Sequence, residues 1–171
     1  GRTIQRNANW QWAVTSEDEW YKAAYHKNYG VTGNYFDYPT SSNIAPSNVL
    51  GNPTDPGNNA TYYNNGYTIG SPYWRTEVGA HENSDSPYGT FDQGGNVWEW
   101  NEAVLYYGSS RGLRGGSFYD LDDLLRAAAR GSYGPAGEGN SLGFRVSEVP
   151  EPATIALLAL ASVGIIRRRK G

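Results

Sequence analysis

Gly94-Gly95-Asn96-Val97-Trp98-Glu99-Trp100 is the densest local pattern in this sequence. Side chains two positions apart on an extended segment point to the same face, so Trp98 and Trp100 are expected on one side and Val97 and Glu99 on the other. A buried carboxylate without a partner is costly. The pattern therefore predicts that Glu99 is supplied with a cation, with hydrogen-bond donors or with a route to water. The alternative is a core strand with one carboxylate at its edge.

The composition indicates one loop-rich domain. A chain of 171 residues suits a single domain, with at most a short appendage. It contains 22 Gly, 14 Tyr and 6 Trp, which is typical of a fold with many turns and aromatic anchors rather than of a helical bundle. The formal net charge of −3 provides no basic surface for nucleic acid.

Residue types that often carry metal or redox chemistry are scarce. The sequence has no Cys, which excludes disulfides, thiolate nucleophiles, zinc–thiolate sites and iron–sulfur clusters. The only two histidines are His26 and His81, so a metal site with three histidine ligands is excluded as well.

Capping chemistry predicts one helix early in the chain. The Ser16 side chain can accept from the Glu19 amide while the Glu19 side chain accepts from the Ser16 amide, which is a capping box. Trp20 and later residues follow at helical spacing, and Gly30 is expected to end the helix. Apolar and alternating runs predict an extended segment over residues 1–14 and strands over residues 96–104, 113–118, 124–130 and 142–146.

Residues 30–86 form one long connection, rich in Asn, Gly, Pro, Ser and Tyr, with turn chemistry throughout. A loop region of this length inside a domain suggests a functional role or stabilisation by bound ions. Disorder is the alternative, but the recurring aromatic residues indicate packing instead: Tyr62, Tyr63, Tyr67, Tyr73 and Trp74.

Residues 147–171 are predicted to be a separate unit. Regular structure is interrupted by Val149-Pro150-Glu151-Pro152. The nearly apolar run 153–166 is followed by Arg167, Arg168, Arg169 and Lys170. A helix of this length spans about 21 Å, less than the roughly 30 Å hydrocarbon core, so length alone favours a buried helix or a signal-like region. Its position at the chain end beside four cations favours a membrane anchor, with the cations on the cytoplasmic side.

This tail resembles the PEP-CTERM sorting signal of exported bacterial proteins. The three parts of that signal occur here in order: the Pro150-Glu151-Pro152 motif, the apolar helix and the arginine-rich end. The resemblance implies export, transient retention in the inner membrane through the C-terminal helix, and processing by an exosortase-type membrane enzyme. It also implies a final location at the cell surface or in the extracellular matrix.

The body of the chain resembles the formylglycine-generating enzyme (sulfatase-modifying factor) family. This resemblance implies an α+β fold of the C-type-lectin-like kind, poor in regular secondary structure, over residues 1–146. The family's first strands and helix are missing before the predicted helix, which suggests a truncated chain. The matching pieces, in the family's order, are Ser16–Trp20 with Ala23-Ala24, Ser86–Asp92 leading into Gly95–Trp100, Leu113–Ser117, Arg126 to Arg130, and Leu142–Arg145.

The same resemblance implies a structural calcium site. Carried over onto this sequence, its ligands are the side chains of Asp92 and Glu99 and the backbone carbonyls of Gly95 and Val97. Two carboxylates and two carbonyls are hard oxygen donors of the kind that Ca²⁺ prefers. A calcium ion bound there would be one possible partner for the carboxylate of Glu99.

The chemistry of the enzyme is excluded, because it relies on a cysteine pair that binds copper, and copper(I) needs soft thiolate ligands. That pair is expected just after Ser117, near Asp120, in a chain without Cys. The leading hypothesis is an exported, non-catalytic, calcium-stabilised module that binds or builds structure. Its exposed aromatic residues would bind a glycan or peptide; the alternative is that they form the core.

The rival hypothesis is an enzyme of another type, with a hard metal held near Asp120 by Asp122 and Asp123 and with Ser117 in the same region. A solvated acidic loop is the favoured interpretation of these three aspartates.

Overall fold

The computed structural model describes residues 6–7, 9–30, 33–51 and 57–148. They divide into two compact units: residues 14–145 form the larger one, and residues 6–13 and 146–148 belong to the smaller one. Among the described residues, no helix is long and apolar enough to cross a membrane. The predicted hydrophobic helix and the sorting-signal residues from Val149 to Arg169 lie outside the described residues.

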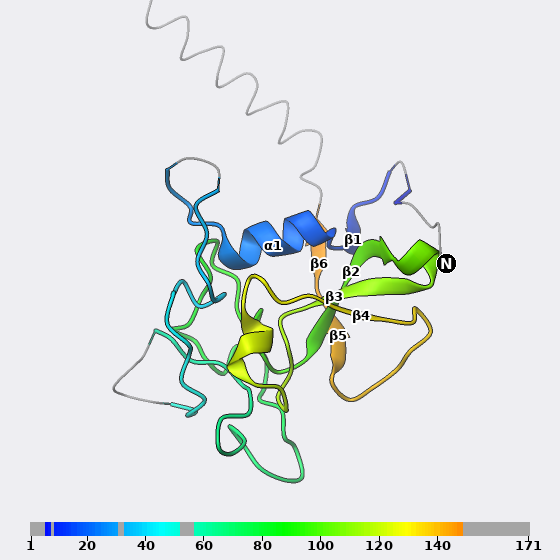
Figure 1. The fold of residues 1–171 in the computed structure, drawn as a ribbon. Coiled ribbons are helices and arrows are strands. Elements are labelled where there is room, and N and C mark those ends of the chain that lie inside the picture. The colour runs from blue at the N-terminus through cyan, green and yellow to red at the C-terminus, as the bar shows by residue number, and fades with distance from the viewer. Residues whose placement is uncertain (1–5, 8, 31–32, 52–56, 149–171) are drawn as a thin grey trace, which may run out of the picture. The chain divides into compact units, whose positions relative to one another are not determined.

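A four-stranded mixed sheet and one helix organise the larger unit (Figure 1). The strands lie in the order β4-β3-β2-β5; β3 is antiparallel to β2 and to β4, and β5 is parallel to β2. A separate two-stranded sheet pairs β1 (Trp12–Val14) with β6 (Val146–Glu148). The other elements are α1 (Glu17–Tyr25), β2 (Trp98–Leu105), η1 (Tyr106–Gly108), β3 (Ser110–Arg114), η2 (Asp122–Leu125), β4 (Gly131–Tyr133) and β5 (Leu142–Phe144).

Helix α1 begins as the sequence predicts and ends earlier. The Ser16 side chain accepts from the Glu19 amide at 3.2 Å, and the Glu19 carboxylate accepts from the Ser16 amide at 2.8 Å, so the capping box is confirmed. The helix stops at Tyr25, and the prediction that Gly30 ends it is wrong. The Tyr25 carbonyl, which a longer helix would need, accepts instead from the Phe36 amide at 2.8 Å.

Two glycines shorten the predicted strand 113–118. Strand β3 ends at Arg114, because Gly115 and Gly116 have φ values of 95° and 71°. Those values lie in the left-handed region, which glycine adopts at little cost and which breaks an extended strand. The chain therefore turns sharply just before Ser117.

The predicted strand 124–130 is wrong. Residues 122–125 form the short helix η2 instead, and the next strand, β4, begins at Gly131. The Leu124 amide donates to the Leu121 carbonyl at 3.2 Å and closes a turn there. Leu125 is fully buried, so its apolar character reflects core packing and not an extended run.

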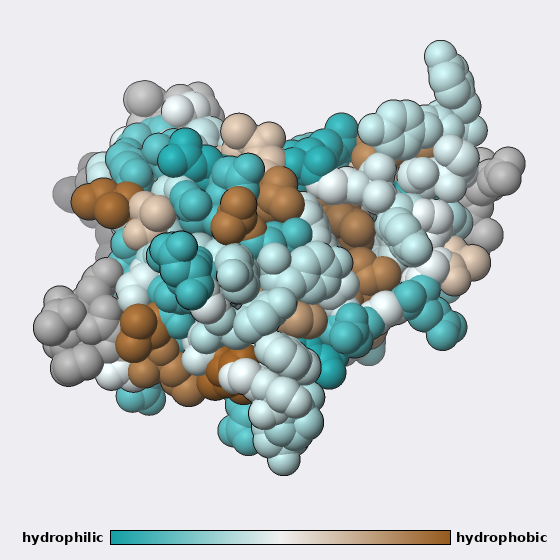
Figure 2. Space-filling view, turned by 60° about the horizontal axis from the view of Figure 1, so that its bottom comes forward, coloured by the Kyte–Doolittle hydropathy of each residue, from teal (hydrophilic) through white to brown (hydrophobic). Residues whose placement is uncertain are grey.

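The long connection between α1 and β2 is packed, as its aromatic residues indicate. In its described part it forms isolated bridges rather than strands. Its Tyr38, Ala60 and Tyr62 are buried together with Leu125 in one core cluster. A second cluster, Trp20 with Ala24 and Tyr25, comes from α1. On the face seen in Figure 2, hydrophobic residues gather in several small patches separated by hydrophilic surface.

Candidate functional site

Glu99 lies in β2 and is only 6% exposed. Its carboxylate accepts three hydrogen bonds. Trp20 Nε1 and Arg145 Nε both donate to Oε2 at 2.5 Å, and Arg145 Nη2 donates to Oε1 at 2.6 Å. A forked guanidinium–carboxylate pair of this kind is among the stronger polar contacts in proteins. Of the three partners that the sequence left open for Glu99, a cation, hydrogen-bond donors or a route to water, the structure shows donors.

The register of the sheet explains how these partners meet. Glu99 pairs with Gly143 across the parallel β2–β5 ladder. Arg145 follows Gly143 by two positions, so both are expected on the same face, the face of Glu99. Trp20 reaches the carboxylate from α1, where it is fully buried. Sequence reasoning named Arg145 only as part of a motif; its pairing with Glu99, across 46 positions, depends on this register.

The other predicted ligands precede β2 directly. The Asp92 side chain accepts from the Gly79 amide at 2.5 Å. The Gly95 amide donates to the Gly115 carbonyl at 2.8 Å. A Cβ at Gly95 would lie 2.1 Å from the Thr61 carbonyl oxygen, so this position accepts only glycine.

Some oxygen atoms in this segment keep hydrogen-bond capacity that no described donor fills. A carboxylate offers about four lone-pair directions, and three donors occupy Glu99, which leaves one on Oε1. The buried Oδ1 of Asn96, between Gly95 and Val97, also lacks a partner in the described chain. Hard oxygens without donors are what Ca²⁺ coordinates.

Two of the three acidic residues that follow β3 accept hydrogen bonds from neighbouring residues of the domain. Asp120 Oδ2 accepts from the Ser117 amide at 2.9 Å and from the Ser117 hydroxyl at 2.5 Å. Asp122 accepts from the Tyr38 hydroxyl at 2.8 Å, and Asp123 is exposed. In the part of the chain that the structure describes, no three His, Asp or Glu side chains are grouped so that they could hold a metal ion.

Each of the two histidines contacts a hydroxyl group. His81 is buried, and its Nε2 lies 2.9 Å from the Thr61 hydroxyl oxygen. Burial lowers the pKa of His81, and the nearby charge of Asp92 raises it in part. His26 Nδ1 lies 2.9 Å from the Tyr88 hydroxyl oxygen.

The single capped helix, the small mixed sheet and the long packed connections define an α+β domain of the C-type-lectin-like kind. Residues 4–149 match the sulfatase-modifying factor enzyme 1-like domain, and the chain belongs to this family. Residues 148–170 match the PEP-CTERM protein-sorting motif. A comparison with curated proteins finds no match.

Several solved structures share the fold, among them the following three. Treponema denticola variable protein 1 is 26% identical, with a TM-score of 0.57 over 84% of this chain and 50% of its own. CarF is 22% identical, with a TM-score of 0.62 over 87% and 52%. PvdO from Pseudomonas aeruginosa is 20% identical, with a TM-score of 0.53 over 81% and 53%. This chain therefore spans about half the length of each.

The two matches define the broad role of the chain. It is an exported protein with a formylglycine-generating-enzyme-like domain. Its PEP-CTERM motif indicates export and sorting to the cell surface.

Proposed function

We propose that the domain over residues 1–146 is a non-catalytic binding or structural module, stabilised by calcium, on the cell surface. The absence of Cys from the sequence carries this proposal, because copper(I) needs thiolate ligands. The resemblance places the cysteine pair of the enzyme just after Ser117, where this chain has Asp120. The carboxylate of Asp120 accepts hydrogen bonds from the amide and the hydroxyl of Ser117.

The calcium ligands would be the carboxylates of Asp92 and Glu99 and the carbonyls of Gly95 and Val97. A bound ion would tie the loop before β2 to the strand itself and would hold the native state only. The guanidinium group of Arg145 contacts the same carboxylate of Glu99. Its positive charge repels a cation, so we expect a modest calcium affinity.

The segment over residues 147–171 would be the sorting tail. We expect its apolar run 153–166 to hold the chain transiently in the inner membrane, with Arg167, Arg168 and Arg169 on the cytoplasmic side. Processing by the exosortase would then release the domain to the surface or the extracellular matrix.

The catalytic part of the proposal is tested with the full chain in the presence of added copper. It is incubated with a cysteine-containing sulfatase peptide, and the products are analysed by mass spectrometry, beside a family enzyme that has its cysteine pair. We expect the peptide to keep its thiol with this chain and to become an aldehyde with the control. Aldehyde formation by this chain would overturn the proposal.

The calcium part is tested by thermal unfolding in calcium and in chelator. At about a hundred times its dissociation constant, calcium should add about 2.7 kcal/mol to the free energy of unfolding. Asp92→Asn keeps an acceptor for the Gly79 amide but removes a charge from the site, so it should shrink this gain. Glu138→Gln, at an exposed position, is the matched control. An unchanged calcium response of Asp92→Asn would contradict the assignment.

A further inference from the structure

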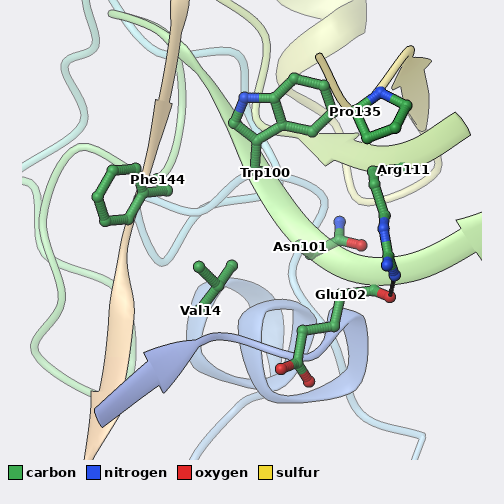
Figure 3. Close-up of a pocket in the computed structure, with 7 residues that line it drawn as sticks. All are labelled: Val14, Trp100, Asn101, Glu102, Arg111, Pro135 and Phe144. Atoms are coloured by element: carbon green, nitrogen blue, oxygen red, sulfur yellow. Dashed lines mark hydrogen bonds between the residues drawn. The ribbon is translucent and has the colours of Figure 1, made fainter. Parts of the chain in front are cut away.

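A cavity of about 440 Å³ lies beside β2 in the larger unit (Figure 3). Its volume is within the range of small-molecule sites. It adjoins the beginning of β3, whereas Asp120 follows the end of that strand. Its walls include Val14, Trp100, Asn101, Glu102, Arg111 and Phe144.

The cavity forms where β2 changes its neighbours. Trp100 still pairs with Phe144 of β5, but the Glu102 amide donates to the Thr15 carbonyl at 3.1 Å. Asn101 lies between these two contacts. On the other edge, the register of β2 against β3 shifts after Trp100. Such irregularities bend a strand and redirect its side chains, which explains why three consecutive residues line one cavity.

Asn101 is held firmly within this irregularity. Its side chain is 2% exposed, and its Oδ1 accepts from the Ala103 amide at 3.0 Å. Opposite it, a Cβ at Gly112 would lie 2.3 Å from Oδ1, so glycine leaves the space that the amide fills. Asn101 Nδ2 has no hydrogen-bond partner within the described chain. Figure 3 shows this amide in the middle of the lining side chains.

The unpartnered Nδ2 indicates a ligand with an oxygen acceptor. A buried donor that stays unbonded costs free energy, and an incoming hydroxyl or carbonyl would recover it. One acidic and one basic residue, Glu102 and Arg111, line the same cavity, with Arg111 Nη1 donating to the Glu102 carbonyl at 2.8 Å. Their formal charges cancel, so the wall favours an uncharged ligand.

The aromatic walls indicate a ligand with a flat apolar face. Trp100 is half-buried, and Phe144, its neighbour across the β2–β5 ladder, is 66% exposed. A pyranose ring combines a C–H face that packs on aromatic rings with hydroxyls that donate and accept. A peptide that adds a strand needs unpaired backbone groups along an edge, and here the Glu102 amide already pairs with Thr15.

We propose that this cavity binds an uncharged saccharide, with Asn101 Nδ2 donating to a sugar oxygen and with Trp100 and Phe144 packing on the ring. The inference rests on the proposed function as a binding module and names its ligand class. It uses none of the predicted calcium ligands, so the two can fail separately. Aldehyde formation with saccharide binding intact would overturn only the non-catalytic role.

The experiment follows the side-chain amide of Asn101 by ¹H–¹⁵N NMR in the full chain, in a detergent whose headgroup is not a sugar. The probes are cellotriose, maltotriose and chitotriose, each added up to about 10 mM, and a proline-rich peptide for comparison. We expect at least one trisaccharide to shift the Asn101 resonance with saturation. No shift with any of the three, or a shift with the peptide alone, would overturn the proposal.

Variants separate the pocket from general surface binding. Asn101→Asp keeps the acceptor for the Ala103 amide but loses the donor, and we expect about tenfold weaker binding. Phe144→Ala removes an exposed aromatic side chain that lines the cavity. It should also weaken binding, without a large effect on folding. Tyr107→Asn removes an exposed aromatic side chain elsewhere and suits the φ of 55° there. Equal loss with Tyr107→Asn, or full affinity in Phe144→Ala, would overturn the assignment.

Discussion

The replacement Glu99→Gln tests the central polar contact of the domain. The Gln amide keeps the shape of the side chain, but it loses the charge and places an NH₂ group against donors. The remaining carbonyl oxygen can accept from Trp20 Nε1 and Arg145 Nε, but Arg145 Nη2 would face the NH₂ group and lose its acceptor. Breaking a buried ion pair by removing one partner costs about 3–5 kcal/mol. A small domain has roughly 5–15 kcal/mol of total stability, so this is a large fraction.

The assay is urea unfolding followed by tryptophan fluorescence, in chelator, so that calcium plays no part. In thermal unfolding of a domain of this size, the same loss corresponds to a fall in melting temperature of roughly 6–20 °C. Glu138→Gln removes an exposed carboxylate and should change stability by less than about 0.5 kcal/mol. If Glu99→Gln costs less than about 1 kcal/mol, the expectation that loss of this buried ion pair costs about 3–5 kcal/mol is refuted.

Three further outcomes follow from the geometry. Gly95→Ala should destabilise the domain by more than about 3 kcal/mol, because its Cβ would overlap the Thr61 carbonyl, whereas Gly66→Ala, in open space, should be tolerated. Ser16→Ala should cost about 1 kcal/mol through loss of the helix cap, measured by urea unfolding. Burial lowers the pKa of His81 in the folded state, so the unfolded state binds more protons and stability should fall as pH drops below about 6.5. His81→Gln should remove that part of the pH dependence, and an unchanged profile would contradict it.

Local chemistry made some features predictable from the sequence. The capping box needs only residues three positions apart, so Ser16 and Glu19 mark the start of α1 correctly. The Trp-Glu-Trp pattern correctly predicts that Glu99 needs a partner. The family's motifs, which occur in order along the chain, give the fold class and the exported character.

The remaining features depend on contacts between distant segments. The end of α1 is set by Phe36, which takes the carbonyl of Tyr25. The partner of Glu99 is set by the β2–β5 register. The cavity at Asn101 arises because β2 exchanges one neighbour for another, and no periodicity in the sequence reports such an exchange. The role of Gly112 is likewise visible only once Asn101 is placed against it.

The parallel pairing of β5 with β2 has a consequence for how the chain matures. A polypeptide that emerges with its N-terminus first, from a ribosome or a translocation channel, presents Glu99 long before Arg145. The ion pair between Glu99 and Arg145 can therefore form only after the last residues of the domain have emerged. The sorting motif begins at residue 148. The residue that completes the ion pair with Glu99 therefore emerges directly before the motif that sorts the protein.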